Sequence, residues 1–256
     1  MTKRSQKPQY GIDAPGLVRF FFIAGTGSLA IVSCIQLLSI TNLIITIIVT
    51  VLFLIIAFYL LGMGTFMIYY SKVTKLNERE KQLDLVQWSG DELVLDVGCG
   101  RGLMLVGAAK RLNNSGRAIG IDIWQQQDQS NNNSSAVVTN AELEDVRSRI
   151  EVQTADMRQM PFPENYFDIV VSNWTVHNLE AESDRQKTLD EIIRVLKPGG
   201  RLILTDIVNQ AEYAKYLAQR GMTNIELHNN KRRDRILKVI TFSSFAPSTV
   251  LACKVS

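Results

Sequence analysis

The pattern of hydrophobic and polar residues divides the chain into an apolar N-terminal part and a mixed remainder. From Phe20 to Ser71 there is no Asp, Glu, Lys, Arg or His over 52 residues, whereas a membrane-spanning helix needs about 20 apolar residues. The run predicts two spans, Phe20–Ser39 and Leu43–Ile68, joined by a short polar turn. We therefore expect two transmembrane helices at residues 20–71. The alternative, a cleaved signal peptide, requires a shorter apolar stretch and a small-residue cleavage site.

After the apolar part, short hydrophobic runs alternate with segments of helical periodicity. Lys72–Trp88 predicts a charged helix within a linking segment at residues 72–92. Five runs predict strands, at Leu93–Val97, Arg117–Ile123, Ile150–Thr154, Phe167–Ser172 and Arg201–Ile207. Thr223–His228 and Thr249–Val255 predict a closing antiparallel pair. Because apolar strands alternating with helices form parallel sheets covered on both faces, residues 93–256 predict a doubly wound α/β domain.

The distribution of charge adds a location to this picture. The chain has 28 Lys and Arg against 25 Asp and Glu, a net charge of +3. The excess lies in the first 71 residues, and the remaining 24 basic and 24 acidic residues balance. A domain without net charge has no overall field to attract nucleic acid, so we expect no nucleic-acid partner. Three cysteines are too few for a disulfide scaffold, and no cluster of metal ligands is expected.

Basic residues flank both ends of the apolar run. They are Lys3, Arg4, Lys7 and Arg19 before it, and Lys72, Lys75, Arg79 and Lys81 after it. Positively charged flanks stay on the cytosolic side of a membrane. The sequence therefore predicts an integral membrane protein with a cytosolic N-terminal arm at residues 1–19, two spans, and a cytosolic catalytic domain.

A glycine-rich turn follows the first predicted strand and reads Asp96-Val97-Gly98-Cys99-Gly100-Arg101-Gly102. Glycines permit a tight strand-to-helix turn and let a ligand approach the backbone. Asp122, at the end of the second strand, can accept hydrogen bonds from ribose hydroxyls. A dinucleotide fingerprint would need glycine where Leu103 stands, and Asp96 would repel a pyrophosphate but suit an ammonium group. The pattern favours S-adenosylmethionine over a nicotinamide cofactor. The alternative for Asp96 is a carboxylate that only caps the loop.

Four motifs follow one another between Leu93 and Ile207: V-L-D-V-G-C-G-R-G, G-I-D-I-W, D-M-R-Q-M-P-F-P-E-N-Y-F-D-I-V-V-S-N and R-V-L-K-P-G-G-R-L-I-L-T-D-I. In order and spacing they resemble the motifs of class I S-adenosylmethionine-dependent methyltransferases. They are most similar to the small-molecule branch typified by ubiquinone and menaquinone methyltransferases. The resemblance implies a seven-stranded, Rossmann-like sheet with a late antiparallel strand, S-adenosyl-L-methionine as cofactor, and a linking segment that helps to cover the pocket.

The resemblance also implies a set of cofactor contacts. They are Asp96 at the methionine ammonium, Gly98, Cys99, Gly100 and Gly102 along the methionine and ribose, Asp122 at the ribose hydroxyls, Ile123 and Trp124 against the adenine, Asp156 at the adenine amino group with Met157 beside the ring, and Asn173 and Trp174 towards the sulfonium and acceptor. Cys99 is expected to be a small loop residue rather than a reactive thiol. The alternative for Trp124 is a place in the core.

The acceptor is less well defined by the sequence. His177, just after the fourth strand, is the candidate general base, with a pocket wall or a structural role as alternatives. Enzymes that methylate amino nitrogens usually carry an N/D-P-P-Y loop after the fourth strand. This chain has Ser172-Asn173-Trp174-Thr175 there, which disfavours an amino-nitrogen acceptor. The apolar N-terminal part favours a small-molecule or lipid-like acceptor.

The sequence leaves two alternative functions, and two interpretations of one basic segment. The alternatives to a methyltransferase are a membrane-anchored S-adenosylmethionine binder that acts as an assembly factor without turnover, and a nucleotide-cofactor oxidoreductase. The basic run Lys231–Arg235 is expected to be a solvated loop, with a contact to anionic headgroups as its alternative.

Overall fold

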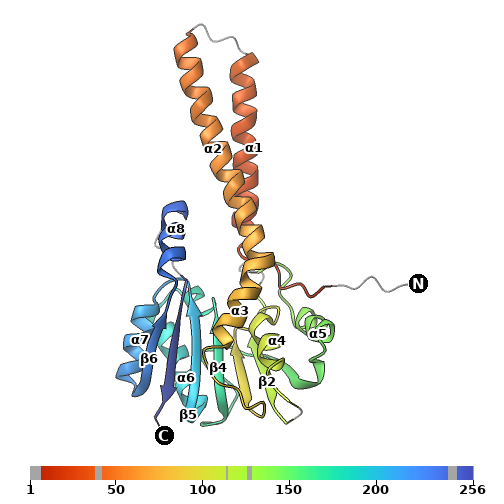
Figure 1. Ribbon diagram of the computed structural model, residues 1–256, viewed down its shortest axis with the longest axis vertical. Coiled ribbons are helices and arrows are strands. Elements are labelled where there is room, and N and C mark those ends of the chain that lie inside the picture. Colours follow the sequence, from red (N-terminus) through yellow and green to blue (C-terminus); the bar gives the residue numbers. More distant parts are fainter. Residues whose placement is uncertain (1–6, 38–41, 114, 126–128, 242–246, 256) are drawn as a thin grey trace, which may run out of the picture. The chain divides into compact units, whose positions relative to one another are not determined.

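The computed structural model describes residues 7–37, 42–113, 115–125, 129–241 and 247–255 (Figure 1). These residues form two compact units. We call residues 10–75 and 125–132 the hairpin unit. Residues 76–124 and 133–255, together with the segment that ends at Gln9, are the sheet unit.

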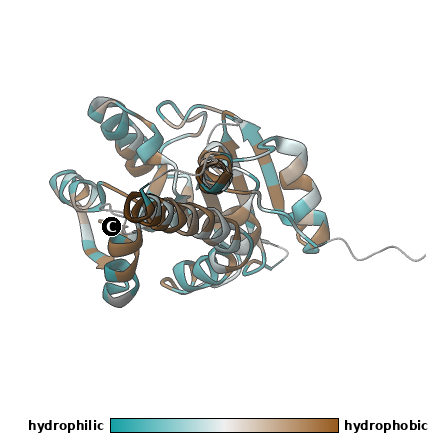
Figure 2. Cartoon of the chain, turned by 90° about the horizontal axis from the view of Figure 1, so that it is seen from above, coloured by the Kyte–Doolittle hydropathy of each residue, from teal (hydrophilic) through white to brown (hydrophobic). Residues whose placement is uncertain are grey.

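Two long helices, α1 (Pro15–Leu37) and α2 (Leu43–Tyr69), form most of the hairpin unit. Both are long and apolar enough to cross a membrane, and they are largely brown, that is hydrophobic, in Figure 2. The side chain of Ile23 is 71% exposed and that of Phe58 is 83% exposed. Removing such a side chain from water stabilises by about 1.5–3 kcal/mol, so these helices present a surface that favours an apolar surrounding. Most of the predicted turn between them lies outside the described residues.

Two glycines let the helices of the hairpin approach closely. A methyl group at Gly25 would come within 2.8 Å of the Leu61 side chain, and one at Gly64 within 2.9 Å of Phe22. Small residues at the contact of two membrane helices permit this kind of backbone approach. The packing of α1 on α2 therefore depends on these two positions.

The beginning and the end of the hairpin are tied to each other. The buried Lys75 ammonium donates to the carbonyl oxygens of Tyr10 at 2.7 Å and Gly11 at 2.9 Å, and it pairs with the Asp13 carboxylate at 3.1 Å. The Ser71 hydroxyl accepts a hydrogen bond from the Asp13 amide and donates one to its carboxylate. Because Asp13 precedes α1 and Lys75 follows α2, the chain enters and leaves the hairpin at the same end.

A seven-stranded sheet, in the order β3-β2-β1-β4-β5-β7-β6, forms the sheet unit. Its strands are β1 (Leu93–Val97), β2 (Arg117–Asp122), β3 (Ile150–Thr154), β4 (Phe167–Asn173), β5 (Leu196–Asp206), β6 (Met222–His228) and β7 (Ser248–Lys254). The first five are parallel, and β7 runs antiparallel to both β5 and β6. Successive residues of β1 and β4 are buried, which means that both faces are covered. This confirms the predicted α/β sheet.

The elements after α2 also include further helices. They are α3 (Lys75–Leu83), α4 (Leu103–Ala109), α5 (Ser134–Leu143), α6 (Glu182–Val195), α7 (Gln210–Gln219) and α8 (Lys231–Thr241), with single turns η1 (Tyr70–Thr74), η2 (Arg147–Arg149) and η3 (Val176–Asn178). Helix α4 contacts β1 to β4 and α5 contacts β3, whereas α6 contacts β5 and α7 contacts β6 and β7.

Two elements differ from the sequence-based expectation. The segment Lys72–Trp88 is not one helix: the π-helical turn η1 leads into α3, which ends at Leu83. The basic run Lys231–Arg235 is not a solvated loop but the first turns of α8. The Asn230 side chain accepts a hydrogen bond from the Arg233 amide at 3.0 Å and so caps this helix.

We predict that both ends of the hairpin lie on the cytosolic side of a membrane. The physical reasons are the basic flanks and the ties between Asp13 and Lys75. Reporters fused before Met1 and after Ser256 of the full chain should both be active only as cytosolic fusions. Opposite readings from the two fusions would contradict a two-span hairpin.

Candidate functional site

The sequence-predicted site residues gather where the carboxyl ends of the parallel strands meet. From the central strand β1 the sheet continues through β2 to β3 on one side and through β4 to β5 on the other. In open α/β sheets, ligands bind beyond the carboxyl ends of the strands at such a switch point. The glycine loop, Asp122, Asn173 and His177 all belong to this edge of the sheet unit.

The glycine loop is closed by hydrogen bonds at both of its ends. The amides of Gly98 and Cys99 donate to the carbonyl of Ile121 at 2.8 and 3.0 Å. At the other end, the Asp96 carboxylate accepts a hydrogen bond from the Leu105 amide in the first turn of α4 at 2.8 Å. Asp96 therefore caps the loop, which is the alternative that the sequence left open for it. Its contact with a methionine ammonium stays a prediction.

Gly98 marks the closest contact between this loop and the segment after β4. Its φ angle is +71°, in the left-handed region that favours glycine. A methyl group there would lie 2.0 Å from the methyl of Thr175. The Thr175 hydroxyl donates to the Gly98 carbonyl at 3.2 Å. The glycine thus brings the cofactor loop against the segment that carries His177.

Burial changes the acidity of two groups of the loop, the Asp96 carboxyl and the Cys99 thiol. Asp96 is 1% exposed, and burial, reinforced by the nearby charge of Asp122, raises the pKa of its carboxyl to about 8. A cation placed at this carboxyl would favour the ionised form, so the site fits an ammonium group. Burial, with the charges of Asp96 and Asp122, also raises the pKa of the Cys99 thiol. A thiol in this state is unreactive, in agreement with the small-residue interpretation.

Asp122 holds the loop from the second strand. Its carboxylate accepts hydrogen bonds from the amides of Gly100 at 2.8 Å and Trp124 at 2.6 Å. Beyond it, Ile123 is 49% exposed, and the Trp124 indole donates to the Thr154 hydroxyl at 2.8 Å. Neither Ile123 nor Trp124 belongs to the buried core. These positions leave apolar side chains at the edge where the adenine is expected.

Asp156 is paired more strongly than the sequence indicates. The Arg158 guanidinium donates to both of its carboxylate oxygens, with the shortest bond at 2.7 Å, and also reaches Asp184 at 2.7 Å. These hydrogen bonds lower the pKa of Asp156 and raise that of Arg158. The adjacent Met157 is half-buried and packs against the core of the sheet unit. An adenine amino group would share Asp156 with Arg158.

His177 is held by a buried carboxylate that the sequence analysis did not single out. The Asp206 side chain is fully buried and accepts hydrogen bonds from the amides of His177 at 3.0 Å and Ile207 at 2.8 Å. The Nδ1 atom of the His177 ring lies 2.5 Å from Oδ1 of Asp206. The same oxygen accepts the hydrogen bond from the Ile207 amide. Because an ionised carboxylate only accepts hydrogen bonds, Nδ1 is the donor in this contact, and Nε2 is the acceptor when the ring is neutral.

Asp206 and Thr175 are the two residues of this edge that sequence reasoning missed. Asp206 ends β5 as Asp122 ends β2, so an acid at a strand end was the available signal. Asn173 ends β4 and its carbonyl accepts a hydrogen bond from Thr175 at 3.1 Å. Trp174 adopts a φ angle of +54° beside it, an uncommon conformation for a bulky residue.

Comparison with known proteins agrees with this geometry. Residues 95–204 match the family model described as a methyltransferase domain. This stretch runs from β1 through β5 and contains the glycine loop, Asp122 and His177. Residues 95–204 form a class I S-adenosylmethionine-dependent methyltransferase domain. S-adenosyl-L-methionine is the methyl donor of such a domain. This match favours methyl transfer over the oxidoreductase alternative.

Relatives of the methyltransferase domain act on small molecules. The chain is 34% identical over 110 residues to a demethylmenaquinone methyltransferase of Symbiobacterium thermophilum, which covers 43% of this chain and 40% of the relative. It is 34% identical over 120 residues to the 27-O-demethylrifamycin SV methyltransferase of Amycolatopsis mediterranei. This alignment covers 47% of this chain and 40% of that relative. The chain thus spans about 40% of the length of these relatives.

The fold has counterparts among solved structures. A methyltransferase from Aquifex aeolicus, described as S-adenosylmethionine-dependent, superposes with a TM-score of 0.52 at 22% sequence identity. The superposition covers 71% of this chain and 92% of that one. This likeness shows the shared architecture of the sheet unit.

Asp96→Asn is expected to stabilise the domain at alkaline pH and to weaken cofactor binding. Because burial raises the folded-state pKa of Asp96 above 3.8 to about 8, the folded state keeps a proton that the unfolded state releases. Stability is therefore lost as pH rises from about 4 to 8. Asparagine preserves the Leu105 bond without that loss. The thermal midpoint of the variant should exceed that of the wild type at pH 8 by about 2–4 °C for each kcal/mol recovered.

The same carboxyl should make cofactor affinity depend on pH. Binding of an ammonium group favours the ionised form, so wild-type affinity should rise by up to about tenfold per pH unit between roughly pH 6 and 7.5. Calorimetry in buffers of different ionisation enthalpy would detect the released proton. If the wild type binds the cofactor with the same affinity across this pH range, Asp96 does not contact the ammonium group.

Asp122→Ala is expected to weaken S-adenosylmethionine binding by about 1–3 kcal/mol, because it removes a charge-assisted acceptor and a support of the glycine loop. Equilibrium binding on the full chain in detergent would measure the change. Glu151→Ala is the matched control, since Glu151 is an exposed carboxylate near the other end of the neighbouring strand β3. Equal affinity of both variants would exclude Asp122 from the site.

Proposed function

We propose that this protein transfers a methyl group from S-adenosylmethionine to a lipid-soluble small molecule of quinone type, at the cytosolic surface of a membrane. The observation that carries the proposal is the His177–Asp206 pair, which stands next to the glycine loop at the carboxyl edge of the sheet. The cofactor loop and a proton acceptor thus meet at one place in the sheet unit.

The cofactor contacts of this proposal come from the chain's own residues. Asp96 would hold the ammonium, the glycines the methionine chain, Asp122 the ribose hydroxyls, and Trp124 one face of the adenine. S-adenosylmethionine, when bound, supplies a methyl group already activated on a sulfonium. The protein therefore mainly has to position the acceptor and exclude water.

His177 would take up the proton that the acceptor loses. A hydroxyl or a ring carbon activated by a hydroxyl becomes a better nucleophile when a base removes its proton. The hydrogen bond from Nδ1 to Asp206 fixes the ring and directs Nε2 to act as that base. Asp206 also stabilises the imidazolium that forms. Proton transfer of this kind typically contributes about 10²- to 10⁴-fold to a rate.

Two observations support the choice of acceptor. One relative is described as a demethylmenaquinone methyltransferase, so a related domain serves a quinone-type small molecule. The helices α1 and α2 are long and apolar enough to cross a bilayer. A tethered enzyme meets an acceptor in the membrane without moving its apolar tail through water, which would expose surface at about 25 cal/mol per Å².

The experiment is a methyl-transfer assay with the full chain in lipid vesicles. Labelled S-adenosylmethionine is supplied with a prenylated hydroquinone in the bilayer or with a short water-soluble hydroquinone. We expect transfer to the prenylated acceptor, with a rate that falls by about 10²-fold or more in His177→Ala and in Asp206→Asn. Cofactor affinity should stay unchanged in both variants. His228→Ala, which alters the only other histidine of the sequence, is the matched control.

Each other outcome points to a different conclusion. Transfer to neither hydroquinone, with tight cofactor binding, would favour the assembly-factor alternative. Transfer to the soluble hydroquinone alone would contradict the membrane acceptor. Undiminished transfer in His177→Ala would exclude it as the base and leave it as part of the pocket wall.

A further inference from the structure

We propose that α8 is a docking helix through which the sheet unit lies against an anionic lipid bilayer. This inference rests on the proposed membrane function and adds to it a second, electrostatic contact. It concerns a part of the chain that lies outside the matched methyltransferase domain at residues 95–204.

Helix α8 exposes an apolar stripe. Ile236 is 50% exposed, Val239 68% and Ile240 38%, and their spacing of three and four residues places them on one side of the helix. The opposite side faces the sheet unit through Asp234 and Leu237, which are buried. Three large aliphatic side chains in a row at the surface indicate a contact with an apolar medium.

A basic stripe runs beside the apolar one. Lys231, Arg235 and Lys238 recur at spacings of four and three residues and are exposed. Among the described residues none of the three takes part in an ion pair, because Asp234 is engaged by Arg233 at 3.1 Å. A helix that combines Lys and Arg on one side with aliphatic residues on another is typical of helices that lie in the headgroup region of a membrane.

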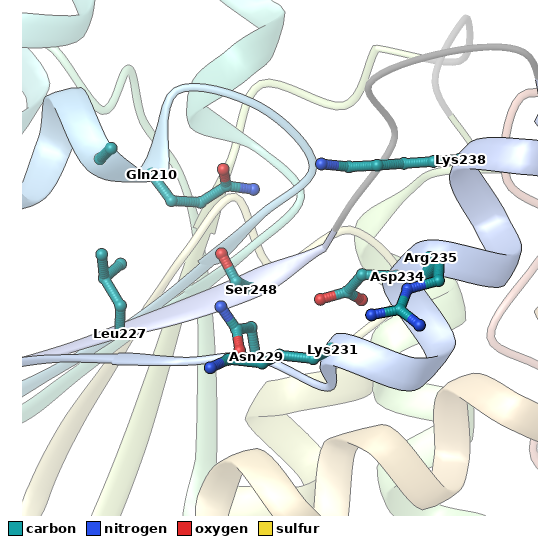
Figure 3. Close-up of a pocket in the computed structure, with 9 residues that line it drawn as sticks. Gln210, Leu227, Asn229, Lys231, Asp234, Arg235, Lys238 and Ser248 are labelled. Carbon is teal, nitrogen blue, oxygen red and sulfur yellow. The ribbon is translucent and has the colours of Figure 1, made fainter.

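The basic side chains line a groove between the end of β6 and the start of β7, which is also lined by Asp234, the carboxylate that pairs with Arg233. Figure 3 shows Lys231, Arg235 and Lys238 around it, together with the polar side chains of Asn229 and Ser248. Cations and hydrogen-bond donors in one groove suit the phosphate and glycerol hydroxyls of an anionic headgroup. None of the cofactor contacts expected from the sequence lines this groove.

The position of α8 is fixed by an ion pair with α3. The Arg233 guanidinium lies 2.7 Å from the Glu78 carboxylate, and it also donates to the Pro247 carbonyl at 2.6 Å. Glu78 follows Tyr69, the last residue of α2, by only nine helical residues. Since a helix rises 1.5 Å per residue, the chain limits their separation to about 14 Å. The covalent chain therefore keeps Glu78, the partner of Arg233, close to the end of α2.

The direction of β6 gives this contact a functional consequence. Strand β6 is antiparallel to β7, which is antiparallel to β5, so β5 and β6 end at the same edge of the sheet. Helix α8 follows β6 and so begins at the edge that carries Asp206 and Asp122. Docking of α8 would turn the acceptor side of the sheet unit towards the lipid surface.

The test measures how deeply α8 lies in the membrane in the full chain. Spin labels are attached, one at a time, to Val239→Cys, Ser115→Cys and Ile48→Cys. The background carries Cys34→Ser and Cys253→Ala, and Cys99 is kept because it is buried and does not react with the label. Nanodiscs contain either phosphatidylcholine alone or a mixture with phosphatidylglycerol. Ser115 is an exposed control at the opposite, amino end of β2, and Ile48 reports insertion of α2.

We expect the Val239 label to become inaccessible to an aqueous nickel chelate and accessible to lipid-dissolved oxygen in the anionic nanodiscs, while Ser115 stays aqueous. Near an anionic surface each Lys or Arg contributes about a five-fold preference for the docked state, so replacement of Lys231, Arg235 and Lys238 by Gln should lower the docked-to-undocked ratio by on the order of 100-fold. Added salt should weaken docking in the same direction.

The outcomes separate this inference from the function on which it rests. An aqueous label at Ile48 would contradict the membrane hairpin itself. A lipid-exposed Ile48 with an aqueous Val239 in anionic nanodiscs would overturn the docking helix and leave the proposed function intact. Protection of Val239 that is equal in both lipid mixtures and unaffected by the Gln replacements would also overturn it, because the contact would then not depend on anionic lipid.

Discussion

The site depends on the burial of two carboxyl groups at the carboxyl edge of a parallel sheet. A buried charge is costly unless it is hydrogen-bonded or paired, and the two groups meet this constraint differently. Asp206 receives two backbone amides and the ring of His177. Within the described part of the chain, Asp96 accepts a hydrogen bond only from the Leu105 amide, and burial raises the pKa of its carboxyl to about 8. The first group fixes a side chain, whereas the second favours a cation from outside.

A single close contact links the two halves of this edge. Gly98 lies directly against Thr175, so the loop that receives the cofactor and the turn that carries His177 form one packed surface. Positioning of the donor and of the base is then a property of the same contact. This suits a reaction in which the methyl group is already activated and geometry is the main contribution of the protein.

The hairpin unit follows a different rule, because its helices are apolar on most of their surface. A strongly polar region of the hairpin unit, around Lys75 and Asp13, lies at the end where the chain enters and leaves the hairpin. Helix α8 repeats this combination of apolar and basic residues within the sheet unit. Lipid as a solvent would account for both features, since apolar side chains avoid water and basic ones favour anionic headgroups.

The sequence by itself determined the elements whose signal is local. Apolar runs such as Leu93–Val97 predicted the strands, and the spacing from the glycine loop to Asp122 predicted the cofactor class, because backbone conformation and strand burial are set by neighbouring residues. It missed α8, since the basic residues concealed a helix that begins at the Asn230 cap.

Only the tertiary structure decided that Asp206 holds His177, that Asp96 caps α4, and that Arg158 binds Asp156 and Asp184. The His177–Asp206 pair joins residues 29 positions apart, and the pairing of β4 with β5 brings them together. Such partners are chosen by the packing of strands and loops, which no local pattern encodes.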